Sequence, residues 1–130
     1  MEGLKERLAT ARRALATLQE LSGLAAPSVL ERDAAVKRFE YSFDIVWKTA
    51  RAYLLAVDGV DERTPKGVIR AARIANLLTD EQTEAALAMT NDRNLTVRTY
   101  NEALARQIFG RLGGHAAILE AWLAAMSARV

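Results

Sequence analysis

The sequence predicts an all-α protein, an antiparallel bundle of four to five helices that forms a single domain over residues 1–130. Two observations predict this class. Apolar residues recur every three or four positions through several long segments, which is the period of an amphipathic helix. Strand signals are missing, because the sequence has no alternating β-branched run and no hairpin dipeptide between such runs. A chain of 130 residues can bury one core but not two.

The first two predicted helices form the N-terminal half of the bundle. The first ends near Gly23, and its apolar stripe is Leu4, Leu8, Ala11, Leu15, Leu18 and Ser22. The second begins at Pro27-Ser28, where Ser28 and Glu31 fit a capping box. Its core stripe is Val36, Phe39, Phe43, Val46, Ala50 and Leu54. We expect it to run for about thirty residues, to near Asp58-Gly59, a length that indicates a long bundle or a dimer seam.

Three further helices are predicted from their start signals. Thr64-Pro65 begins the third, because an N-cap residue is followed by proline at the first helical position. Capping boxes at Thr79/Gln82 and at Thr99/Glu102 begin the fourth and the fifth. Their apolar sides are Val68, Ile69, Ala72 and Leu77, then Ala86, Leu87 and Met89, then Leu104, Ile108, Leu112, Leu119, Trp122, Leu123 and Met126.

Composition excludes several kinds of chemistry. The sequence has no cysteine, which rules out disulfides, cysteine nucleophiles and cysteine metal sites, and makes a reducing cytoplasm the expected location. No apolar run approaches the ~20 residues needed to cross a bilayer, and Met1–Lys5 contains no apolar signal region. The only histidine, His115, falls within the apolar stripe of the last helix. We expect it to be packed or at an interface, and we expect neither a metal nor a cofactor.

Charged residues form two patterns, although the net charge is only +2. The basic residues Arg63, Lys66, Arg70 and Arg73 have the spacing of one face of the third helix. This stripe is either a solvated face or a surface for phosphates or an acidic partner. The second helix carries Lys37, Glu40, Asp44, Lys48 and Arg51 on a polar face. Asp44 and Lys48 have the spacing of a favourable ion pair, and mutual neutralisation is favoured over acid–base or metal chemistry at Glu40 and Asp44.

The segment Asn91-Asp92-Arg93-Asn94-Leu95-Thr96-Val97-Arg98-Thr99-Tyr100 carries the strongest functional signal. It is dense in hydrogen-bonding side chains and is predicted to connect two amphipathic helices. A simple connection needs only a few residues and has no use for two arginines and a tyrosine. We therefore expect the functional site here.

This segment resembles the signature of HEPN domains, specifically the HepT-like branch, also called nucleotidyltransferase substrate-binding proteins. That branch typically reads Asp-Arg-Asn-Leu-Thr-x-His-Thr-Tyr. Two further family-like strings occur in the right order, one at 38–48 and one at 65–70, so the resemblance covers residues 3 to about 127. It implies a helical bundle that forms a homodimer, with the signature segments of two subunits in a shared cleft.

The resemblance also implies an activity and a partner. Active toxins of this branch cut RNA without a metal, and a nucleotidyltransferase antitoxin encoded next door silences them by adenylylating a tyrosine. Carried over to this chain, the phosphate-binding arginine is Arg93, the polar residue after it is Asn94, and the modified tyrosine is Tyr100. Secondary candidates for RNA or partner binding are Arg63, Lys66, Arg70, Arg73 and Lys48.

The chain departs from the family pattern at Arg98, which stands where the family has its histidine. Arginine stays protonated at physiological pH, so it cannot act as a general base, although it can bind phosphate bidentately. We expect RNase activity to be reduced by about 10²–10⁴, the usual effect of losing an acid–base group. His115 lies far along the chain and is not expected to substitute.

Three explanations of Arg98 are open. It is a deliberate or selected substitution that detoxifies an RNase, or the protein is a retired RNase that persists as a partner-binding subunit, or this sub-branch presents substrates to a nucleotidyltransferase and never needed the histidine. The intact Thr99-x-Asn101-Glu102 cap and the retained Tyr100 favour the first. The alternative function is a non-enzymatic adaptor subunit, and a plain helical dimerisation domain is the third.

Overall fold

The computed structural model describes residues 2–96 and 101–130, and every regular element in these ranges is helical. The helices are α1 (Glu2–Ser22), α2 (Val29–Tyr53), the π-helix η1 (Leu54–Asp58), α3 (Pro65–Ile74), α4 (Asp80–Thr96) and α5 (Glu102–Ser127). The predicted all-α helical bundle is confirmed.

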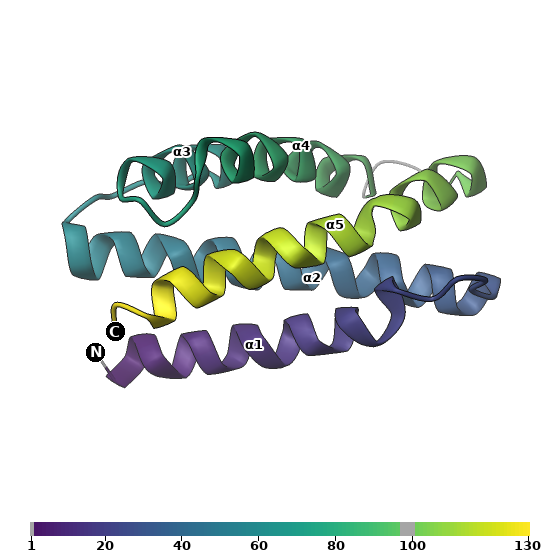
Figure 1. Ribbon diagram of the computed structural model, residues 1–130, viewed down its shortest axis with the longest axis horizontal. Helices are drawn as coiled ribbons and strands as arrows, with labels where there is room; N and C mark the ends of the chain where they lie inside the picture. Colours follow the sequence, from purple (N-terminus) through teal and green to yellow (C-terminus); the bar gives the residue numbers. More distant parts are fainter. Residues whose placement is uncertain (1, 97–100) are drawn as a thin grey trace.

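Helices α2 and α5 form the middle of the molecule (Figure 1). Helix α1 packs on one side of them, and the α3–α4 hairpin packs on the other. Among the described helices, α1 contacts only α2 and α5. The position of α4 is therefore determined by contacts with α2, α3 and α5 alone.

The predicted apolar stripes form one continuous core. Leu15 and Leu18 of α1, Phe39 and Phe43 of α2, and Trp122 of α5 are almost completely buried within it. A few predicted core positions are only half-buried: Ser22, Val36, Leu87 and Leu104. None of the described helices combines the length and the apolar character needed to cross a membrane.

The second helix has the predicted start and the predicted length. The Ser28 side chain accepts the backbone N–H of Glu31 at 3.1 Å, and the Glu31 carboxylate accepts the N–H of Ser28 at 2.8 Å. The helical run ends at Asp58, but its last five residues form η1, in which hydrogen bonds reach five residues back instead of four. Gly59 then ends the run with φ of 67°, a left-handed conformation that glycine adopts without a steric cost.

Capping contacts define both ends of the α3–α4 turn. Helix α3 begins at Thr64, whose side chain accepts the N–H of Gly67, as predicted. It ends in a Schellman motif, in which Asn76 takes φ of 61° and the N–H of Leu77 donates to the carbonyl of Ala72 at 2.9 Å. The predicted Thr79/Gln82 capping box then starts α4.

Two expectations for the polar segment are wrong. Asn91–Thr96 is not a connection between helices, because α4 continues through Thr96. The polar side chains here find partners on neighbouring helices, so their polarity does not mark a helix end. Helix α5 does not start from a Thr99/Glu102 box: its N-cap is Asn101, whose side chain accepts the N–H of Leu104 at 3.0 Å. Asparagine caps at least as well as threonine. Residues 97–100, which include Arg98, Thr99 and Tyr100, lie outside the described residues.

Two isoleucines of α3 provide a matched test of the core. Ile69 is fully buried, whereas Ile74 is 78% exposed. Ile69→Ala should lower the free energy of unfolding by about 2–5 kcal/mol, because it removes buried methyl groups and leaves a cavity. Ile74→Ala should change it by less than about 0.5 kcal/mol. Urea denaturation followed by circular dichroism measures both, and equal losses would show that α3 does not pack as described.

Candidate functional site

Three consecutive residues near the end of α4 reach three different helices, and we call Asn91, Asp92 and Arg93 the junction. The Asn91 side chain accepts a hydrogen bond from Lys66 of α3 at 2.9 Å. Asp92 points to α5 and Arg93 points to α2. Successive residues of an α-helix differ in direction by about 100°, so adjacent side chains can address separate neighbours. The junction therefore ties α4 to every helix that it contacts.

Asp92 is the buried member of the junction, with 7% of its surface exposed. Arg111 donates to it through Nε and Nη2, both at 2.8 Å, and His115 Nε2 lies 2.7 Å from its Oδ2. Burial alone would raise the pKa of Asp92. The hydrogen bonds from Arg111 and His115, together with the positive charge of Arg111, outweigh burial, so the pKa of Asp92 is lowered from its ordinary value. The carboxylate therefore stays ionised inside the bundle.

His115 is buried, as the sequence predicted, but it is not remote from the signature segment. Its ring stacks on that of Phe39 with a centroid distance of 5.3 Å, and its Nε2 contacts Asp92, the neighbour of Arg93. Sequence reasoning missed this cluster. The available signal was the spacing of Arg111 and His115, which places both one turn apart on the same face of α5.

Arg93 is held by two carboxylates of α2. Its Nε and Nη2 donate to the two oxygens of Asp44 at 3.1 and 2.9 Å, and its Nη1 lies 3.7 Å from Glu40. The hydrogen bond that Arg93 donates to Asp44 is the main reason that the pKa of Arg93 is raised; burial opposes the shift, and the charges of Asp44 and Glu40 add to it. Arg93 of α4 thus neutralises the charges of Glu40 and Asp44. Its contact with Asp44 takes the place of the ion pair that was expected between Asp44 and Lys48.

A cleft of about 280 Å³ lies beside Arg93, between α2, the end of α4 and the start of α5. Glu40 lines it and also contacts Arg93, which is not itself a lining residue. Apolar side chains supply much of the remaining wall: Val36, Leu95, Leu104, Ala105 and Ile108. Asn94 is exposed on the same turn of α4. The charged side chains in the wall are two carboxylates, Asp33 and Glu40, and one ammonium group, Lys37.

The basic stripe does not form one free surface. Arg63 precedes α3 instead of lying on it, and it pairs with Asp61 at 3.2 Å. Lys66 donates to Asn91, and Arg73 pairs with Asp80 at 2.6 Å. Arg70 is exposed, and Lys48 lines a shallow groove between α1 and α2. Of these residues only Lys66 is tied directly to the junction. Within residues 2–96 and 101–130, no three histidine, aspartate or glutamate side chains gather in a way that could hold a metal ion.

The Asp92 cluster predicts a defined loss of stability. Asp92→Asn should lower the free energy of unfolding at pH 7 by about 1–3 kcal/mol, because it removes charge-assisted hydrogen bonds and leaves buried donors unpaired. Asp61→Asn, at an exposed ion pair, should cost less than about 1 kcal/mol. Denaturant unfolding measures both.

The same cluster predicts a pH dependence. The pKa of Asp92 in the folded state is below its ordinary value of 3.8, so the ionised carboxylate stabilises the fold above that pH. The stabilisation is lost as the pH falls through the folded-state pKa. The difference in stability between the native protein and Asp92→Asn should therefore shrink below about pH 4. A difference that stays constant down to pH 2 would contradict the contact.

Comparison with known proteins shows which family the chain resembles. Residues 6–128 match the family model described as nucleotidyltransferase substrate binding protein like. A comparison with curated proteins found no match.

Solved structures share the whole bundle. A crystal structure of a Thermus thermophilus protein is 52% identical, with a TM-score of 0.87 over 89% of this chain and 98% of that chain. A tri-AMPylated Shewanella oneidensis HEPN toxin, solved in complex with an MNT antitoxin, is 16% identical, with a TM-score of 0.78 over 96% of each chain. A toxin–antitoxin structure with a mutated component is 15% identical, with a TM-score of 0.80 over 98% of this chain and 99% of that chain. At these low identities the two toxin complexes support the HEPN fold alone.

Proposed function

Because the chain belongs to the nucleotidyltransferase substrate-binding-protein-like family, which has the HEPN fold, we propose that it is the toxin-type half of a two-component system. Its partner in this proposal is a nucleotidyltransferase antitoxin, the kind of protein found with the HEPN toxins of similar fold. The proposal includes a cytoplasmic homodimer in which two signature segments share a cleft. The observation that carries it is Arg93, which contacts the cleft residue Glu40, in a signature that is intact except at Arg98.

The proposed chemistry of an active form is RNA cleavage without a metal. The 2′-oxygen forms a bond to phosphorus while the bond from phosphorus to the 5′-oxygen breaks. One group must accept the 2′-hydroxyl proton, and one must donate a proton to the leaving 5′-oxygen. Arg93 and Arg98 can both bind the phosphate and stabilise its charge, with Asn94 as a polar neighbour. Neither arginine can accept the proton. The protein with arginine at position 98 is therefore a scaffold for this reaction with little activity.

The contacts of Arg93 support a low affinity for RNA in this form. Its guanidinium already makes two hydrogen bonds to Asp44, and Glu40 adds a second negative charge 3.7 Å away. An RNA phosphate must share or replace these carboxylates, which repel it. The same contacts favour the second candidate function, a non-enzymatic adaptor that binds the nucleotidyltransferase, because an arginine held in this way serves as a structural link.

Restoring histidine at position 98 tests the RNase proposal. Arg98→His, expressed without a partner, should be toxic to cells. The purified variant should cleave RNA about 10²–10⁴ times faster than the protein with arginine at position 98. Cleavage of a labelled RNA with EDTA present measures the rate. Arg93→Gln in the Arg98→His background should abolish cleavage while circular dichroism shows a folded bundle.

A second set of outcomes separates the two candidate functions. If Arg98→His neither poisons cells nor cuts RNA, the scaffold is not an RNase. Retained binding of the nucleotidyltransferase by the Arg93→Gln variant would then identify the adaptor. Failure of the native protein to bind the nucleotidyltransferase would argue against both.

Tyr100 provides an independent test of the partner. Co-expression with the nucleotidyltransferase encoded next to this gene should add one or more AMP groups, and mass spectrometry should place them on Tyr100. Tyr100→Phe should remain unmodified, because it lacks the phenolic oxygen that attacks the nucleotide. Tyr41, a half-buried tyrosine on α2, serves as the internal control and should stay unmodified. An unmodified Tyr100 would remove adenylylation from the proposal.

A further inference from the structure

Arg93 is closed to a phosphate in the described structure, because a carboxylate of α2 fills its hydrogen-bonding face. Its Nε and Nη2 donate to the two oxygens of Asp44 at 3.1 and 2.9 Å, and its Nη1 lies 3.5 Å from the Thr96 hydroxyl. A guanidinium group binds a carboxylate and a phosphate with the same fork of two parallel hydrogen bonds. Asp44 therefore occupies the position that a phosphate would take on this side of the arginine.

The contact between Arg93 and Asp44 differs in exposure from the neighbouring contacts of Asp92. The Asp44 side chain is 34% exposed, whereas the Asp92 side chain is 9% exposed and receives its donors from α5. Breaking a partly exposed ion pair costs little, because both charges regain water. Asp92 would still anchor α4 on α5, so Arg93 would keep its place near the end of α4. The contact with Asp44 is therefore one that can open while the bundle stays folded.

A second partner for Asp44 lies one turn further along α2. Lys48 is exposed and has the i,i+4 spacing that favours an ion pair with Asp44. It forms no ion pair with any residue in the ranges 2–96 and 101–130. Asp44 can therefore exchange Arg93 for Lys48, and this exchange leaves the arginine fork open. The spacing that predicts a pair between Asp44 and Lys48 then corresponds to an open state of the site.

We propose that Asp44 is an autoinhibitory carboxylate, which closes the phosphate-binding face of Arg93 when it pairs with the arginine and opens it when it pairs with Lys48. This inference rests on the proposed function, because it assigns a regulation to the arginine through which RNA would bind. The exchange needs no proton-transfer group. It consequently applies with either arginine or histidine at position 98.

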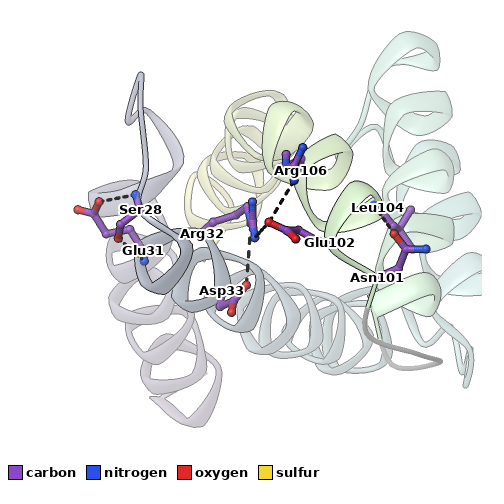
Figure 2. A network of polar contacts seen from close by, with 8 residues as sticks. All are labelled: Ser28, Glu31, Arg32, Asp33, Asn101, Glu102, Leu104 and Arg106. Carbon is purple, nitrogen blue, oxygen red and sulfur yellow. Dashed lines mark hydrogen bonds and ion pairs between the residues drawn. The ribbon is translucent and has the colours of Figure 1, made fainter.

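Binding of a short 2′-O-methyl RNA, followed by fluorescence anisotropy at low ionic strength, tests the proposal without turnover, since this RNA lacks the 2′-hydroxyl that starts cleavage. Asp44→Asn should bind the RNA about tenfold more tightly than the native protein, because the competing charge is gone. Glu102→Gln is the matched control, since Glu102 contacts Arg32 and Arg106 at the start of α5 (Figure 2). It also removes one carboxylate, but one outside the contacts described for Arg93, and should change binding by less than about twofold.

Lys48→Gln distinguishes an exchange partner of Asp44 from a direct RNA contact. In the native background it should weaken RNA binding by about twofold, because the open state loses its ion pair. In the Asp44→Asn background it should have no more effect than Lys5→Gln, which removes an exposed lysine of α1. An equal loss of affinity in both backgrounds would show that Lys48 contacts RNA itself, and would overturn the exchange.

Glu40→Gln keeps the test decisive if Asp44→Asn does not fold, which circular dichroism establishes. Glu40 lies 3.7 Å from Nη1 of Arg93, so it adds negative charge without a hydrogen bond, and its loss should leave the fold intact. This variant should bind RNA about twofold more tightly than the native protein. The proposal is overturned if folded Asp44→Asn, or Glu40→Gln in its place, binds RNA no more tightly than Glu102→Gln, including the case in which none of them binds.

The binding assay and the cleavage assay fail separately. Cleavage by Arg98→His with unchanged RNA binding by Asp44→Asn would contradict the autoinhibitory role of Asp44 alone. Tighter binding by Asp44→Asn without cleavage by Arg98→His would contradict the RNase alone.

Discussion

The structure depends on the ion pair between Asp92 and Arg111, because it fixes the end of α4 against α5 inside the bundle. A buried carboxylate is tolerated only where donors surround it, and here Arg111 and His115 supply three. Once Asp92 is fixed, the helical repeat directs Arg93 toward α2 and Asn91 toward α3. The residue that matters most for the proposed chemistry is therefore oriented by its neighbour in the sequence.

This arrangement separates the scaffold of the site from its reactivity. The contacts described for Asp92 and Arg93 are made with α5 and α2, which lie outside the signature segment. Under the proposed function, loss of the proton-transfer group at position 98 removes none of these partners from the sequence. Such a separation explains how an RNase scaffold could persist as a binding subunit.

Local patterns predicted most of the fold. The boxes at Ser28/Glu31 and Thr79/Gln82 and the proline after Thr64 marked helix starts correctly, because these contacts are made between near neighbours in the chain. Contacts between helices were not predictable in this way. Nothing in the spacing of Asp44 and Lys48 indicated that Arg93, far along the chain, would displace the lysine. The polar side chains after Asn91 have the composition of a loop, although they belong to α4, because the hydrogen-bond partners of Asp92 and Arg93 lie on other helices.

The π-helix at the end of α2 also sets the direction in which the chain leaves that helix. A π-turn contains more residues than an α-turn, so Leu54–Asp58 alters the rotation that a regular helix would give to the segment after it. If the same five residues formed regular α-helix instead, the exit would be rotated by about 100°, the turn of one residue. The α3–α4 hairpin would then leave α2 in another direction. The geometry of this short element therefore helps to set where α3 and α4 lie, and with them the junction.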